Sequence, residues 1–169
     1  FGFFSFTNWN SYRVYNWKPC ANYIVCKMNL LVLHGPNINL IGSISSRNGE
    51  RVTLSKIDSK LKRVARESNI NLKIMQTHKV FGAINFIQRN RKWADGLLFN
   101  PASWSKYEYS LLECLIAADI TTIEIALSKN YSLIDNDINS IFNDFCKKTL
   151  TGDPLEVYVD GISEIQKFI

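Results

Sequence analysis

From Met28 onward, short apolar runs alternate along the chain with longer amphipathic segments. Five of these runs are rich in Ile, Leu and Val, and we predict strands over residues 29–34, 72–77, 96–100, 121–127 and 155–159. Runs that are apolar throughout are typical of parallel strands buried on both faces. The alternation therefore predicts an α/β fold with five parallel strands.

The clearest helical pattern lies between the first two predicted strands. Apolar side chains recur there at helical spacing, at Leu54, Ile57, Leu61, Val64 and Ala65. Thr53 is a suitable N-cap and Asn69 a suitable stop signal. Weaker patterns predict helices over residues 83–91, 107–118, 138–148 and 162–168. With right-handed crossovers, this order predicts a flavodoxin-like, doubly wound sheet of strand order 2-1-3-4-5, with any ligand site at the carboxyl ends of the strands.

Residues 1–27 differ in composition from the rest of the 169-residue chain. They contain no acidic residue and nine aromatic ones: Phe1, Phe3, Phe4, Phe6, Trp9, Tyr12, Tyr15, Trp17 and Tyr23. The segment has neither the features of a secretory signal nor those of an organellar presequence. We therefore expect it to lie outside the fold, to make few contacts with the rest, and to be followed by a single domain over residues 28–169.

Three interpretations of this aromatic N-terminal segment stay open. It is an artefact of the reading frame or a disordered segment, a remnant of a longer precursor, or an aromatic interaction arm. Its composition favours the first. A cytoplasmic location is expected unless residues 1–27 belong to an organellar precursor.

Charge and cysteine usage exclude several classes of protein. The net charge is +5, of which residues 1–27 contribute +3, and the basic residues of the remainder are interspersed with acidic ones, which argues against a nucleic-acid surface. No run approaches the roughly 18 apolar residues that a membrane-spanning helix needs. The four cysteines form no C-x-x-C pair and have no histidine at metal-ligand spacing, so structural or free thiols are expected.

Three short polar loops follow the predicted strands at the edge where a ligand is expected: residues 34–42, 100–103 and 127–130. None has the G-x-G-x-x-G spacing of a dinucleotide site. The chain also contains no P-loop and no G-x-S-x-G nucleophile motif. Dinucleotide-binding proteins, P-loop nucleotide hydrolases and common serine hydrolases are therefore disfavoured.

The run LVLHGPNINLIG at residues 31–42 resembles the opening strand and G-P-N-x-N-x-x-G loop of the type II 3-dehydroquinate dehydratases. The resemblance continues through ADGLLFNPA at 94–102 and IEIALS at 123–128, and extends from Met28 to about Ser140. It implies a flavodoxin-like subunit that forms a homo-oligomer, a trimer or a dodecamer. It also implies dehydration of 3-dehydroquinate to 3-dehydroshikimate without metal or cofactor, as in aromatic amino acid biosynthesis.

In the chemistry that this resemblance implies, a tyrosinate removes a proton next to a ketone and a histidine protonates the departing hydroxyl. An arginine lowers the pKa of the tyrosine, which is otherwise about 10. This chain has Gly49 at the position of the tyrosine, Ile44 at that of the arginine and Ala126 at that of the histidine. Other departures from the family pattern are Val80 for an acidic residue, Lys106 for a histidine, Leu133 and Asp137 for arginines, and Glu113 for an aspartate that reaches a neighbouring subunit.

Asn37, Asn100 and Ser128 match the family pattern and are the candidate substrate-binding residues. Each also has a structural interpretation: Asn37 braces its loop, Asn100 initiates an Asn-Pro turn, and Ser128 is a plain turn residue. In the functional interpretation, Ser128 offers its hydroxyl and its backbone N–H to an anion. For His34 a structural hydrogen bond is favoured over proton transfer, and His78 is a weak candidate for a displaced acid.

Three functions stay open, and no catalytic residue is assigned. The residues favour a protein of the dehydroquinase fold that is inactive or strongly impaired in dehydration, and they do not rank an assembly or interaction subunit against the binding module named last. The first alternative is an active dehydratase in which Tyr107, Tyr109 or Tyr131 is a relocated base and Arg47 or Arg51 its activator. The second is a small-molecule binding module, with a small anionic ligand as its partner.

Overall fold

The computed structural model describes residues 27–132 and 139–169, which form one five-stranded parallel sheet. Its strands are β1 (Met28–His34), β2 (Ile70–Gln76), β3 (Gly96–Asn100), β4 (Thr121–Leu127) and β5 (Lys148–Gly152). The strand order is β2-β1-β3-β4-β5, and every neighbouring pair is parallel. The predicted flavodoxin-like fold and its strand order are confirmed.

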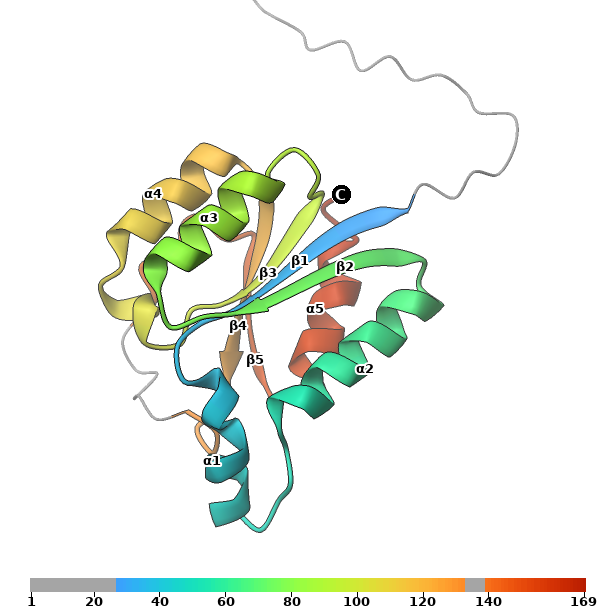
Figure 1. Ribbon diagram of the computed structural model, residues 1–169, viewed down its shortest axis with the longest axis vertical. Helices are drawn as coiled ribbons and strands as arrows, with labels where there is room; N and C mark the ends of the chain where they lie inside the picture. Colours follow the sequence, from blue (N-terminus) through green and yellow to red (C-terminus); the bar gives the residue numbers. More distant parts are fainter. Residues whose placement is uncertain (1–26, 133–138) are drawn as a thin grey trace, which may run out of the picture.

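Helices cover both faces of the sheet (Figure 1). One face packs against α2 (Leu54–Glu67) and α5 (Val157–Ile165), and the other packs against α3 (Val80–Asn90) and α4 (Tyr109–Ala118). Two short elements, the 3-10 helix η1 (Ile38–Leu40) and α1 (Ile41–Arg47), follow β1 at its carboxyl end, and a second 3-10 helix, η2 (Ala102–Lys106), follows β3. Loops and short helices thus gather at the carboxyl edge of the sheet.

The central strand β1 shows how the sequence builds this double-sided core. Leu30 and Val32 pack in the cluster of α2 and α5, whereas Leu31 and Leu33 pack in the cluster of α3 and α4, and all four are fully buried. Successive side chains of a strand point to opposite faces, so a continuous apolar run fits a strand with helices on both sides. The apolar pattern therefore predicted β1, β3 and β4 well.

Helix α2 begins and ends where its sequence signals indicate. The Thr53 hydroxyl accepts a hydrogen bond from the backbone N–H of Lys56 at 3.3 Å, as expected of an N-cap. Asn69, directly after the C-cap residue, adopts the left-handed conformation with φ 55°. Ile57 and Leu61 lie on the buried face. The helix predicted between the first two strands is confirmed.

The chain after β4 departs from the prediction. The segment 155–159 is not a strand, because Val157 begins α5. The helix predicted over 138–148 is also wrong, because the described residues 139–147 form turns and bends and Lys148 begins β5. A five-residue apolar run cannot distinguish a buried strand from the buried face of a helix. As an edge strand, β5 carries polar residues around Leu150, so it lacks the continuous apolar run of the inner strands.

Residues 1–26 and 133–138 lie outside the described part of the chain, so the expected separation of residues 1–27 from the domain stays a prediction. Within the described part, no helix is both long and apolar enough to cross a membrane. No group of three or more His, Cys, Asp or Glu side chains in residues 27–132 and 139–169 could hold a metal ion.

Candidate functional site

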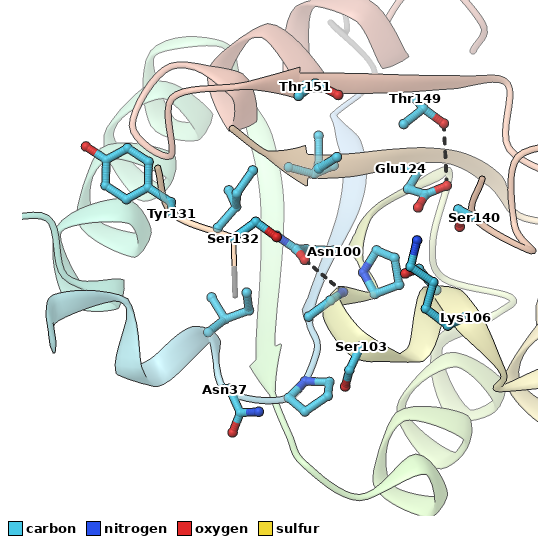
Figure 2. Close-up of a pocket in the computed structure, with 18 of the residues that line it drawn as sticks. Asn37, Asn100, Ser103, Lys106, Glu124, Tyr131, Ser132, Ser140, Thr149 and Thr151 are labelled. Carbon is cyan, nitrogen blue, oxygen red and sulfur yellow. Dashed lines mark hydrogen bonds between the residues drawn. The ribbon is translucent and has the colours of Figure 1, made fainter. Parts of the chain in front are cut away.

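A pocket of about 220 Å³ lies at the carboxyl edge of the sheet, where the fold class places ligand sites (Figure 2). It is bounded by the loops after β1 and β3, by the later part of β4, and by the segments on both sides of residues 133–138. The described lining residues include Asn37, Ile44, Asn100, Ser103, Ser105, Lys106, Glu124, Ala126, Tyr131, Ser132, Asn139, Ser140, Asn143, Thr149 and Thr151.

The lining is rich in neutral polar groups. Hydroxyl groups of serine and threonine and carboxamides of asparagine make up most of the polar side chains, and Figure 2 shows several of them around the cavity. The charged groups among the described lining residues are Lys106 and Glu124, which are of opposite sign. Such a lining suits a small molecule that carries several hydroxyl or carbonyl oxygens.

Glu124 is the most unusual of these lining residues, because it places a carboxyl group inside the sheet. It lies in the middle of β4 and is only 2% exposed. Burial raises the pKa of Glu124, while hydrogen bonds from Ser140 and Thr149 and the charge of Lys106 oppose the rise. The Thr149 hydroxyl donates to its Oε2 at 3.4 Å (Figure 2). A buried carboxyl with a raised pKa in a pocket is typical of functional sites.

Two of the three candidate binding residues line the pocket. Asn37 adopts a left-handed conformation with φ 65°, and its backbone N–H donates to Nδ1 of His78 at 3.3 Å. Asn100 is 2% exposed, and its Oδ1 accepts from the backbone N–H of Ala102 at 3.1 Å, which is the turn expected of an Asn-Pro pair. Ser128 is not among the described lining residues, and its backbone N–H donates to the Gly152 carbonyl at 2.9 Å. That N–H is therefore not available to an anion.

The positions that the resemblance assigns to catalysis are apolar or empty of a side chain. Ile44 and Ala126 line the pocket, and Gly49 lies just after α1 with φ +76° and nothing within 4 Å of a Cβ at that position. Lys106 lines the pocket, whereas Val80 begins α3 and is not among the described lining residues. Glu113 is exposed on α4, and Leu133 and Asp137 lie outside the described residues.

Of the three tyrosines considered as relocated bases, only Tyr131 lies at the pocket. Its hydroxyl donates to the Glu50 carboxylate, and this bond, together with burial, raises the pKa of Tyr131 well above its ordinary value. Tyr107 and Tyr109 are 60% and 62% exposed and are not among the described lining residues. The candidate activators are Arg47 and Arg51, which are exposed and likewise not among those residues.

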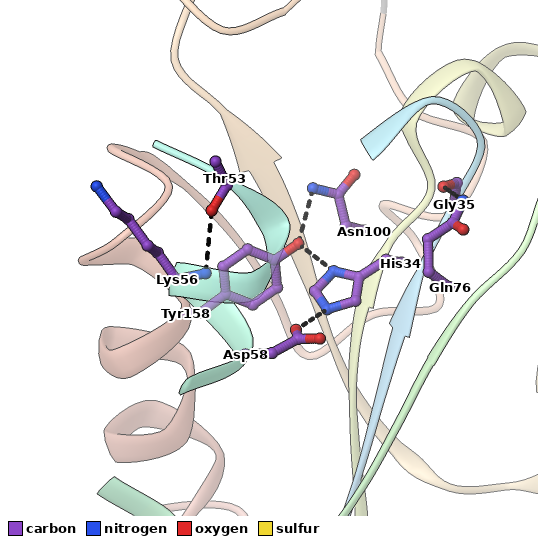
Figure 3. Close-up of polar contacts among 8 residues, drawn as sticks. All are labelled: His34, Gly35, Thr53, Lys56, Asp58, Gln76, Asn100 and Tyr158. Carbon is purple, nitrogen blue, oxygen red and sulfur yellow. Dashed lines mark hydrogen bonds and ion pairs between the residues drawn. The ribbon is translucent and has the colours of Figure 1, made fainter. Parts of the chain in front are cut away.

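His34 is fully buried at the end of β1 and belongs to a chain of side-chain hydrogen bonds that leads to Asn100 in the pocket wall (Figure 3). Its Nδ1 lies 2.8 Å from the Tyr158 hydroxyl and its Nε2 lies 3.2 Å from Oδ1 of Asp58. The Asn100 carboxamide donates to the same Tyr158 hydroxyl at 3.1 Å. The structural interpretation of His34 therefore agrees with its contacts.

Sequence reasoning missed three residues that shape this site. Glu124 could have been found, because it is the one ionisable residue in the buried run TTIEIAL. Tyr158 was missed because its segment was predicted to be a strand. Asp58 was missed because the helix was predicted from its apolar positions alone. Their pairing with His34 depends on how α2 and α5 pack side by side on the sheet.

Comparison with known proteins yields one family. The profile described as dehydroquinase class II matches residues 28–166. A 3-dehydroquinate dehydratase of Pelotomaculum thermopropionicum is 35% identical over 108 residues, which are 64% of this chain and 75% of that protein. One from Prochlorococcus marinus is 30% identical over 131 residues, 78% of this chain and 89% of that protein. The crystal structure of a type II dehydroquinase from Butyrivibrio crossotus, at 22% identity, covers 83% of this chain and 98% of its own with a TM-score of 0.73, and so shows the same fold.

Proposed function

This chain belongs to the class II dehydroquinase family, and we propose that it binds a small hydroxylated molecule without dehydrating 3-dehydroquinate at an enzymatic rate. The observation that carries the proposal is the pocket wall at Ile44 and Ala126. The family resemblance places an arginine and a histidine at these two positions. Two aliphatic side chains there can neither stabilise a tyrosinate nor protonate a departing hydroxyl.

The tyrosine at the pocket supports the same conclusion. Proton abstraction next to a ketone requires a phenolate, and a general base works best when its pKa lies near the operating pH. Donation to Glu50 and burial raise the pKa of Tyr131, which moves it further from neutral pH. Tyr131 therefore stays a protonated phenol at neutral pH and acts as a hydrogen-bonding group of the pocket.

The lining supports a ligand with several oxygen atoms. Serine and threonine hydroxyls and asparagine amides can pair with ligand hydroxyl and carbonyl groups. A ligand carboxylate would lie nearest to Lys106, the cationic group among the described lining residues. The charge of Lys106 also acts on Glu124, so the pocket favours an anionic ligand less strongly than an arginine clamp would.

The test is a comparison of turnover between the full chain and a restored variant. The variant carries Ile44→Arg, Gly49→Tyr, Ala126→His and Asp137→Arg, and enone formation from 3-dehydroquinate is followed by ultraviolet absorbance. Because general acid–base catalysis typically contributes about 10²- to 10⁴-fold, the natural chain should be at least about 100-fold slower. Gly49→Tyr adds backbone strain, since φ is +76° at that position, but meets no neighbouring atom.

Equal turnover of the natural chain and the restored variant would contradict the proposal. Turnover of the natural chain that is abolished by Glu124→Gln, and not by the matched change Glu67→Gln at an exposed position of α2, would assign the acid–base role to Glu124. Binding is measured separately by saturation-transfer NMR with 3-dehydroquinate as the probe. Ala126→Leu, which fills the pocket without changing its charge, should abolish the transfer.

The family also supports a homo-oligomeric state, which we propose on one surface observation. Phe81, Tyr107, Tyr109 and Ile116 are 56–76% exposed, and they lie on α3, on α4 and at its start. Helices α3 and α4 pack against each other, and large apolar side chains exposed on such neighbouring helices suit a protein interface. Sedimentation equilibrium should give a mass that is a multiple of three chains, whereas a monomer would contradict this proposal.

A further inference from the structure

Five residues, each from a different element, form a continuous chain of hydrogen bonds, most of which Figure 3 shows. The backbone N–H of Ala102 donates to Oδ1 of Asn100 at 3.1 Å, and Nδ2 of Asn100 donates to the Tyr158 hydroxyl at 3.1 Å. The same hydroxyl lies 2.8 Å from Nδ1 of His34. Nε2 of His34 lies 3.2 Å from Oδ1 of Asp58, on α2.

The two outer groups set the direction of the bonds in this chain, because the Ala102 N–H can only donate and the Asp58 carboxylate can only accept. The N–H of Ala102 can only donate, so it must face the oxygen of the Asn100 carboxamide, and Nδ2 must therefore face Tyr158. The Asp58 carboxylate can only accept, so Nε2 of His34 carries a hydrogen and donates it. Nδ1 of neutral His34 then accepts the hydrogen of the Tyr158 hydroxyl, which has no other acceptor within this chain of bonds. Of the two neutral tautomers of His34, only this one satisfies all the bonds.

Burial keeps the chain in this arrangement. His34, Tyr158 and Asn100 are 0%, 1% and 2% exposed, whereas the side chain of Asp58 is 25% exposed at the outer end. Burial raises the pKa of Tyr158, which makes the neutral phenol, the form that donates, the stable one. Buried polar groups that are left unpaired are costly, so each bond restrains the next.

We infer that Tyr158, held in place by His34 and Asp58, is a positioning residue that orients the Asn100 carboxamide for the ligand. Tyr158 takes one of the two hydrogens on Nδ2, which leaves the second N–H for the pocket that Asn100 lines. The carboxamide therefore meets the ligand as a donor and selects an acceptor oxygen, such as that of a carbonyl, hydroxyl or carboxylate group. This inference rests on the proposed binding function.

The first readout is the tautomer of His34, which needs no ligand. The whole sequence contains two histidines, so long-range ¹H–¹⁵N correlation resolves both imidazoles, and His78→Gln assigns them. The wild type should show His34 with its hydrogen on Nε2. Its Asn100 side-chain amide should show slow hydrogen exchange. A hydrogen on Nδ1, or a rapidly exchanging Asn100 amide, would overturn the inference.

The second readout uses Tyr158→Phe, which removes the hydroxyl and keeps the ring. The Asn100 amide should lose its slow exchange, and the affinity for 3-dehydroquinate as the probe should fall by about 3- to 10-fold, as expected for one hydrogen bond. The control is Ser68→Ala, which also removes one hydroxyl group, because Ser68 is exposed at the end of α2 and lies outside the described pocket lining. Unchanged exchange and affinity in Tyr158→Phe would overturn the inference.

A second pair of variants acts at the outer end of the chain, away from the ligand. Asp58→Leu removes the acceptor for Nε2, and it should change the His34 tautomer signal and the exchange of the Asn100 amide. Asp58→Asn keeps an acceptor oxygen and should restore both. Insensitivity of the Asn100 amide to Asp58→Leu would overturn the inference. Turnover by the wild type, or absence of probe binding with both NMR signatures intact, would instead contradict the proposed function alone.

Discussion

At the carboxyl edge of the sheet, the buried polar groups on its two faces differ in how completely they are hydrogen-bonded. On the face of α2 and α5, the side chains of His34, Tyr158 and Asn100 bond to one another in a chain whose directions all match. On the opposite face, Glu124 lies in the pocket wall beside Thr149, and burial raises its pKa. Matched partners make the first region a rigid support.

The second region retains polar groups that a ligand can pair with. Glu124 bears a burial cost that its hydrogen bonds offset only in part, since the net shift of its pKa is upward. Buried ionisable groups with shifted pKa values cluster at sites that bind or react with something. One edge of the sheet therefore combines a hydrogen-bonded polar support with an open polar cavity, and three substitutions test this division.

The largest effect is expected from Phe142→Ala, on the face of the open cavity. Phe142 is fully buried and packs edge-on against Phe99 with ring centroids 4.9 Å apart, and it anchors the segment that carries Ser140 and Asn143. Truncating a buried phenylalanine typically lowers the free energy of unfolding by about 3–5 kcal/mol. Urea denaturation measures the loss. Phe168→Ala is the control, because Phe168 is 44% exposed and should cost little.

A smaller effect is expected at Gly35, where the loop after β1 meets the turn after β3. A Cβ at this position would lie 2.6 Å from the Pro101 carbonyl oxygen and 2.7 Å from that of Asn100. Gly35→Ala should therefore push the two loops apart and lower the free energy of unfolding by about 1–3 kcal/mol. In the control, Gly42→Ala, the nearest atom is 3.4 Å away and the residue is helical, so that change should be neutral or stabilising. Equal effects of the two substitutions would contradict the close approach.

The third change, Glu124→Gln, alters the pH dependence of stability and not the packing. A carboxyl whose pKa is raised by folding binds its proton more tightly in the folded state, so wild-type stability falls as the pH rises from about 4.5 through the raised pKa. Glutamine cannot ionise. The variant should therefore gain stability relative to the wild type as the pH increases from 4 to 8, as measured by thermal unfolding. A difference in stability between the two proteins that is constant over this range would show that the pKa of Glu124 is not raised in the folded state.

Much of this architecture follows from local sequence patterns. The apolar runs of β1, β3 and β4, the capped helix α2 and the loops at residues 34–42 and 100–103 all lie where the sequence places them. Buried parallel strands need apolar side chains on both faces, so a window of five to seven residues is enough to recognise their pattern. The edge strand β5 and helix α5 were misassigned, because neither shows a period that such a short window can resolve.

The sequence by itself determined the fold class, the strand order, the family resemblance and the edge of the sheet that holds the pocket. The tertiary structure decided which polar groups meet there. His34 pairs with Asp58, 24 residues away, and with Tyr158, 124 residues away, while Thr149 of β5 reaches Glu124 of β4. These pairs depend on how α2, α5 and β5 pack against the sheet, and a short stretch of sequence cannot specify contacts between side chains so distant along the chain.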